Sequence, residues 1–121
     1  MCRPSLPFRF VASLIVATSV TAHADDNVEF FETRIRPVLI EHCYKCHSAD
    51  AKNVRGGLLL DSKAGSRDGG DSGAAVVPGN LDDSLLLAAM KHESFEMPPD
   101  RKLPDRIIAD FEKWIRDGAE D

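Results

Sequence analysis

The sequence predicts a small domain that is mainly α-helical. Apolar residues recur at intervals of three and four, the spacing of one helix face, in residues 26–42 and 104–117. A shorter apolar segment, residues 84–90, indicates a further helix between these two. The intervening segments are rich in glycine. Residues 61–79 alone contain five of the eight glycines of the chain, which indicates a long irregular loop.

The first predicted helix begins near Asp26, which with Glu29 three residues later resembles a capping box. Pro37 interrupts this helix, because proline lacks an N–H and its ring clashes with the preceding turn. The apolar pattern continues across Pro37, so we expect a kinked or two-part helix that ends at Cys43. Its apolar face comprises Val28, Phe31, Ile35, Val38 and Leu39.

The other two predicted helices have recognisable starts. Asp82 and Asp83 precede the middle helix, and Pro104 and Asp105 open the last one; acidic residues and proline are both favoured in a first turn. Gly118 suits the position just after the last helix. The buried faces are expected to comprise Leu86, Leu87 and Met90 in the middle helix and Ile107, Ile108, Phe111, Trp114 and Ile115 in the last.

Two short apolar runs, residues 58–60 and 74–77, are able to pair as a short hairpin. Between them, residues 68–73 read Asp-Gly-Gly-Asp-Ser-Gly. The acidic residues of this run lack the spacing of an EF-hand loop, and no phosphate-binding loop with its lysine is present. We therefore interpret the run as a solvated turn.

Residues 1–24 have the features of a secretory signal peptide. Two arginines give a basic start, a mostly apolar run follows, and an Ala-His-Ala cleavage sequence ends at Ala24. The remaining residues, 25–121, are expected to form one domain that is periplasmic or secreted. The apolar run is too short to span a membrane, and the alternative is an uncleaved N-terminal anchor.

Removal of the presequence makes the chain more acidic. It leaves 97 residues (121 − 24), with 13 Lys and Arg (15 − 2) against 20 Asp and Glu, a net charge of −7. Such acidity argues against binding to nucleic acid or to anionic membrane surfaces. No later segment is apolar for long enough to cross a bilayer, so we expect no membrane span in the mature chain.

The strongest motif is Cys43-Tyr44-Lys45-Cys46-His47, a C-x-x-C-H sequence of the kind that attaches c-type haem. Two thiols three positions apart are able to bond to the two vinyl groups of one porphyrin, and the adjacent imidazole is placed to bind the iron. Residues 25–121 contain no other cysteine. The motif therefore predicts one covalently bound haem c.

Three other uses of a C-x-x-C pair fit this sequence less well. A thioredoxin-like disulfide belongs at a strand-to-helix junction of a βαβ unit, whereas here the pair follows a predicted helix. A zinc site needs a second pair of Cys or His ligands at similar spacing, and the sequence has none. A structural disulfide between Cys43 and Cys46 is the third alternative.

A six-coordinate haem needs a second axial ligand opposite His47, and we expect Met97 to provide it. Met97 precedes two prolines, which stiffen the backbone and reduce the entropy lost when the thioether binds iron. The loop that carries it follows His47 by fifty residues and is long enough to reach the other haem face. The competitors are His92 near the end of the middle helix, Met90 on its apolar face, and His42, which we expect on the proximal side.

The identity of the sixth ligand decides what the iron does. A His/Met pair raises the reduction potential and leaves no open coordination position, which suits electron transfer. A His/His pair would lower the potential, and an open position would allow gas binding or reaction with peroxide. On the proximal side, metal-bound histidines usually donate their second N–H, for which the Pro78 carbonyl is a candidate acceptor.

Several short sequences, taken in order, resemble the planctomycete-type cytochrome c domain, a branch of the cytochrome c superfamily. They are IRPVLIEHCYKCH, RGGLLLDS, GGDSGAAVVPGN, SLLLAAM, MPPD and WIRDGAE, and the resemblance covers residues 28–119. It implies a small cytochrome c-like fold in which the first and last helices cross, with Phe31 or Ile35 against Trp114 or Phe111. It also implies thioether bonds at Cys43 and Cys46, with His47 and Met97 as the iron ligands.

The sequence thus predicts an exported monohaem c-type cytochrome that passes single electrons to or from a redox partner protein, as a carrier rather than an enzyme. One alternative is an electron-entry haem module of a larger redox enzyme. Another, if the iron lacks a methionine ligand, is a peroxidase or gas-sensing haem domain. In this family the domain usually precedes larger domains, so a free-standing carrier and a part of a longer protein both stay open.

Overall fold

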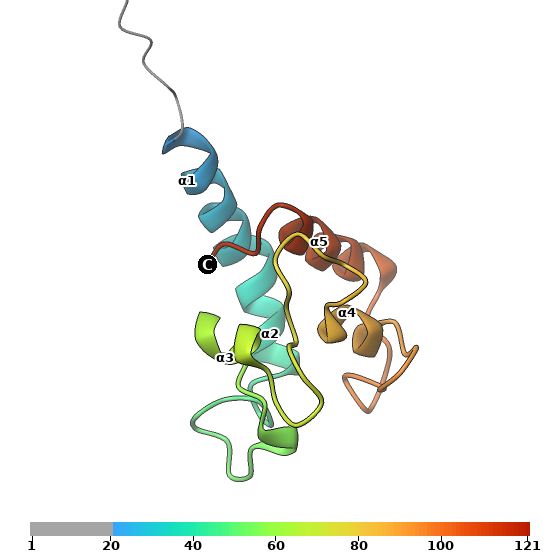
Figure 1. The fold of residues 1–121 in the computed structure, drawn as a ribbon. Coiled ribbons are helices and arrows are strands. Elements are labelled where there is room, and N and C mark those ends of the chain that lie inside the picture. Colours follow the sequence, from blue (N-terminus) through green and yellow to red (C-terminus); the bar gives the residue numbers. More distant parts are fainter. Residues whose placement is uncertain (1–20) are drawn as a thin grey trace, which may run out of the picture.

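The structure, a computed structural model, describes residues 21–121. Within this part of the chain no strand forms, and a single isolated bridge joins Gly70 and Gly73. The mainly α-helical fold that the sequence predicts is therefore confirmed (Figure 1). In order, the elements are α1 Thr21–Phe30, the π-helical turn η1 Phe31–Ile35, α2 Arg36–His42, the 3-10 turn η2 Arg55–Gly57, α3 Lys63–Asp68, α4 Leu85–Met90 and α5 Asp105–Arg116.

The helices α1 and α2 follow one another along one line, and the start of α1 projects away from the rest of the domain (Figure 1). Thr21 is the first described residue and is already helical, so the helix includes residues before the predicted start at Asp26; neither glycine nor proline stands in this stretch. The predicted signal peptide, residues 1–24, lies outside the described residues except for its last four. Among the described helices none is both long enough and apolar enough to cross a membrane.

The break that Pro37 predicts in the first helix is present. Directly before it, the chain forms the wide turn η1, in which the backbone N–H of Arg36 donates to the carbonyl of Phe31, five residues back. Proline cannot donate, and in a regular helix its ring presses on the carbonyl four residues earlier. The wider turn gives that ring room, and α2 continues with Pro37 in its first turn.

The core forms where α5 crosses η1. The rings of Phe31 and Trp114 lie 5.4 Å apart, centroid to centroid, and Phe111 meets Trp114 edge-on at 6.0 Å. The side chains of Ile35, Phe111 and Ile115 have no exposed surface. The predicted crossing of the first and last helices is thus present, with Phe31 against Trp114. Val28 does not share in this core, since 39% of its surface is exposed.

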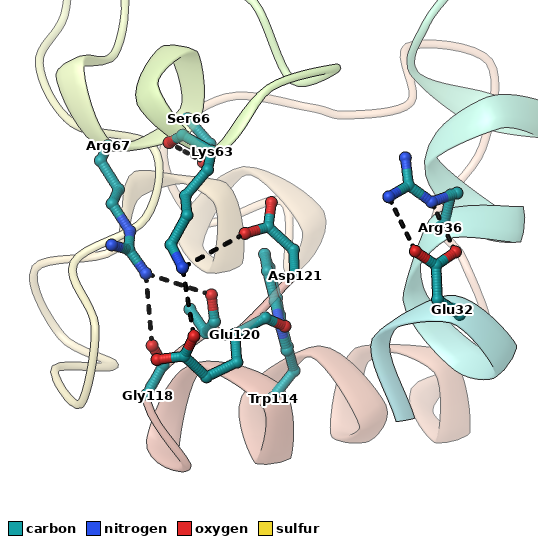
Figure 2. A network of polar contacts seen from close by, with 10 residues as sticks. Glu32, Arg36, Lys63, Ser66, Arg67, Trp114, Gly118, Glu120 and Asp121 are labelled. Carbon is teal, nitrogen blue, oxygen red and sulfur yellow. Dashed lines mark hydrogen bonds and ion pairs between the residues drawn. The ribbon is translucent and has the colours of Figure 1, made fainter. Parts of the chain in front are cut away.

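The C-terminal residues after α5 are tied back onto the domain by polar contacts (Figure 2). The indole Nε1 of Trp114 donates to the Glu120 carbonyl at 2.8 Å. From α3, the guanidinium of Arg67 donates to the Ala119 carbonyl at 3.2 Å, and Lys63 pairs with the Glu120 carboxylate at 3.1 Å. The turn that permits this starts at Gly118, whose φ of 108° disfavours any other residue.

The region between α2 and α4 differs from the sequence prediction in two ways. Residues 58–60 and 74–77 do not pair as a hairpin. An N–H of the first run instead donates to the His47 carbonyl at 2.8 Å, and two N–H groups of the second donate to the Ser66 carbonyl at 3.0 Å. The loop expected at 61–79 also contains the short helix α3, whose start Ser62 caps by accepting from the Gly65 N–H at 3.0 Å.

We predict that the crossing core governs stability, which a matched pair of isoleucines tests. Ile35→Ala removes a fully buried side chain from η1, so the free energy of unfolding should fall by about 2–5 kcal/mol. Ile40→Ala makes the same change on α2 where 56% of the residue is exposed, and it should alter stability by less than about 0.5 kcal/mol. Denaturant unfolding of both variants measures the difference, and equal losses would contradict this account of the core.

Candidate haem-binding site

A cavity of about 520 Å³ lies between the end of α2, the turns that follow it, α4 and the loop before α5. Its volume is within the range of roughly 300–1,000 Å³ that cofactor pockets occupy. The atoms that line it are mostly apolar. The cavity brings together Cys43, Cys46, His47 and Met97, four residues that the sequence singles out as a haem site.

The C-x-x-C-H motif forms one wall of this cavity because the chain turns tightly where α2 ends. The carbonyl of Cys43 accepts from the Cys46 N–H at 3.1 Å and from the His47 N–H at 2.9 Å. This compact turn directs both thiols and the imidazole to the same space, as attachment of one porphyrin and ligation of its iron require.

The orientation of the His47 ring is fixed by a backbone carbonyl. Nδ1 of His47 lies 3.3 Å from the Leu58 carbonyl, and because a carbonyl only accepts, Nδ1 carries the proton. The other ring nitrogen, Nε2, is then free to bind a metal. The sequence-based suggestion of Pro78 as the acceptor is wrong. Leu58 takes this place because its neighbour Leu60 is hydrogen-bonded to the His47 backbone at 2.8 Å.

Cys43 and Cys46 are both free thiols. Burial raises the pKa of the Cys43 thiol to about 11, with a smaller contribution from the adjacent Cys46. This thiol is therefore protonated at neutral pH. In residues 21–121 no group of three or more His, Cys, Asp or Glu side chains is arranged to hold a metal ion.

The wall formed by α4 and the following loop carries the candidates for a second axial ligand. Met97 lines the cavity, and its backbone N–H donates to the Ala89 carbonyl of α4 at 3.1 Å, which holds the loop against that helix. Met90 also lines the cavity and is only 3% exposed. His92 lies outside the cavity wall, and its buried Nε2 has no hydrogen-bond partner. His42 reaches the cavity as well, at the cysteine side.

Glycines shape the edge of the cavity, where two turns approach closely. A Cβ atom at Gly70 would lie 2.1 Å from the Gly56 carbonyl oxygen, so only glycine fits there. Sequence reasoning assigned no role in the site to Arg55, Ser72 or Phe95, which also line the cavity. These three residues follow no helical spacing in the sequence, because turns and a loop, and not helices, place them at the cavity.

The observations fit a haem. The cavity has a suitable size and apolar walls, two thiols and an oriented imidazole share one wall, and a thioether lies on another. No curated protein and no solved structure matches the chain. The family described as planctomycete cytochrome C matches residues 43–101, a stretch that begins at Cys43 and includes Met97. This match agrees with the resemblance that the motifs of the sequence indicated, over the stretch from the cysteine motif to the loop before α5.

Proposed function

We propose that the protein is an exported c-type cytochrome that holds a single haem and carries single electrons. The observation that carries this proposal is the cavity that brings a thiol pair, an oriented imidazole and the thioether of Met97 together. The haem iron, when bound, takes up and releases one electron. In this proposal the protein provides His47 and Met97 as axial ligands, and thioether bonds at Cys43 and Cys46.

The residues around the cavity are suited to hold such a group still. The Leu58 carbonyl accepts from Nδ1 of His47, which orients the ring and makes Nε2 a stronger donor to a metal. Leu60, Leu86 and Leu103 are each at most 6% exposed and line the cavity, so their apolar side chains would keep water from this side of a bound haem. Walls held in place in this way would move little when the iron gains or loses an electron, which suits electron transfer better than chemistry on a substrate.

Met97 is favoured over its competitors by its surroundings. The hydrogen bond from its N–H to the Ala89 carbonyl and the two prolines that follow restrict the backbone at Met97. Little further conformational entropy is therefore lost when its side chain binds a metal. Met90 belongs to the buried face of α4, where packing alone accounts for its position. His92 lies outside the cavity wall. We therefore propose His/Met ligation, which raises the reduction potential.

Export is the second part of the proposal. The basic and apolar presequence supports it, as does the accessibility of the expected cleavage site: residues 23–26 are exposed in the first turns of α1. The acidic surface of residues 25–121 suits a protein partner that offers basic groups.

Removal of one anchoring thiol is predicted to impair stable holoprotein formation. In a host that matures c-type cytochromes, the wild type should gain the mass of one haem, whereas Cys46→Ser retains at most one thioether bond and should give much less stable holoprotein. Lys45→Ala changes an exposed residue inside the same motif and should behave as the wild type. Mass spectrometry and visible spectra measure both, and a normal yield of Cys46→Ser would contradict the attachment.

Loss of the Met97 side chain is predicted to change the visible spectrum and the reduction potential of the haem. Met97→Ala should abolish the weak sulfur-to-iron charge-transfer band of the oxidised protein and lower the reduction potential, because the ligand that raises the potential is gone. Met90→Leu and His92→Ala should keep the band. If the band is lost in His92→Ala or Met90→Leu and kept in Met97→Ala, the assignment of Met97 as the ligand is wrong. If the iron of the wild type has an open coordination position, a peroxidase or gas-sensing role is favoured instead.

Cleavage of the presequence is predicted to occur after Ala24. The protein recovered from the periplasm or medium should begin at Asp25, as N-terminal sequencing or intact mass determines. Ala24→Arg, which places a large charged residue directly before the cleavage point, should leave the chain uncleaved. Glu29→Gln, five residues downstream, is the control and should be processed normally. A wild-type protein that keeps its first residues would favour an N-terminal anchor instead.

A further inference from the structure

The cavity has one polar edge. Apart from the cysteine motif and the adjacent His42, the polar residues that line it are Arg55, Asp71 and Ser72. All three lie on two neighbouring turns, η2 and residues 70–73. The walls formed by α4 and by the loop before α5 contribute only apolar side chains.

Hydrogen bonds fix this polar edge relative to the cysteine motif. The Arg55 N–H donates to the Cys46 carbonyl at 3.0 Å, so η2 is attached directly to the motif. The Asp71 N–H donates to the Gly56 carbonyl at 2.8 Å and joins the two turns. Gly70 lies so close to the same carbonyl that no side chain fits between the two turns. Backbone contacts therefore hold the three residues together at one edge of the cavity.

A haem has a matching asymmetry. Two propionate carboxylates lie on one edge of the macrocycle, and the rest of its periphery is apolar. An ionised carboxylate against an apolar wall is strongly disfavoured unless it is paired, and guanidinium is the side chain best suited to bind a carboxylate through two hydrogen bonds. Arg55 is exposed, and it takes part in none of the ion pairs formed among the described residues.

We propose that this edge is the propionate site, in which the guanidinium of Arg55 binds a haem propionate and the Ser72 hydroxyl donates a further hydrogen bond. The inference rests on haem binding in the cavity and adds the direction in which the haem faces. Asp71 gives the reason that a cation is needed. Its carboxylate lies against Gly57, where a Cβ atom would be 3.1 Å from Oδ1, so one negative charge is already present at this edge.

A crystal structure of the wild-type holoprotein tests the proposal directly. We expect a propionate oxygen within hydrogen-bond distance of the Arg55 guanidinium, and one near the Ser72 hydroxyl. Propionates that instead lie beside Phe95 and the prolines of the opposite loop would overturn it. Failure of the wild type to retain any haem would overturn the proposed function as well, and the mass of the protein reveals this before crystallisation.

The reduction potential gives an independent readout on variants. A cation at the propionates opposes the additional positive charge of ferric iron, so Arg55→Gln should lower the potential relative to the wild type, and Arg55→Lys should restore part of the loss. Lys52→Gln removes an exposed positive charge three residues earlier that does not line the cavity, and should shift the potential less. Equal shifts in Arg55→Gln and Lys52→Gln, or none in either, would contradict the assignment.

Discussion

The packing of α5 across the π-helical turn is the contact on which the rest of the domain depends. Phe31 and Ile35 on one side and Phe111 and Trp114 on the other are at most 5% exposed, so the crossing is nearly free of water. This contact fixes α2, and the end of α2 carries the cysteine motif. The opposite cavity wall depends on it too, because α4 packs on α5. The distance between the two walls of the site is therefore set by a core that lies outside it.

Much of this arrangement is predictable from the sequence, because its causes are local or periodic. Apolar spacing identified α2, α4 and α5, the family resemblance implied the partners at the crossing, and Pro37 marked the break in the first helix. The C-x-x-C-H motif predicts haem attachment at Cys43 and Cys46 without any structure, since the chemistry needs those residue types at that spacing, and both its thiols and its imidazole belong to residues that line the cavity. Met97 was selected because of the prolines beside it, and it does line the cavity.

The remaining features depend on contacts between turns, which leave no periodic pattern. The acceptor for His47 was expected at Pro78, yet the Leu58 carbonyl takes the place, since the backbone bond from Leu60 to His47 holds residues 58–60 beside the motif. The expected hairpin is absent because the N–H groups of both runs bond to carbonyls elsewhere. The polar edge at Arg55 and Ser72 was overlooked for the same reason. A glycine such as Gly70 indicates a close approach, but not which carbonyl it approaches.

The pairing of Phe31 with Trp114 also has a consequence for the order of folding. The two rings are 83 positions apart in the chain (114 − 31 = 83), so the contact must close a long loop before it contributes any stability. The cysteine motif, by contrast, is made by a turn of five residues. That turn closes within a few positions and needs no such loop. The cysteine motif can therefore adopt its local shape before the long-range contact between η1 and α5 closes.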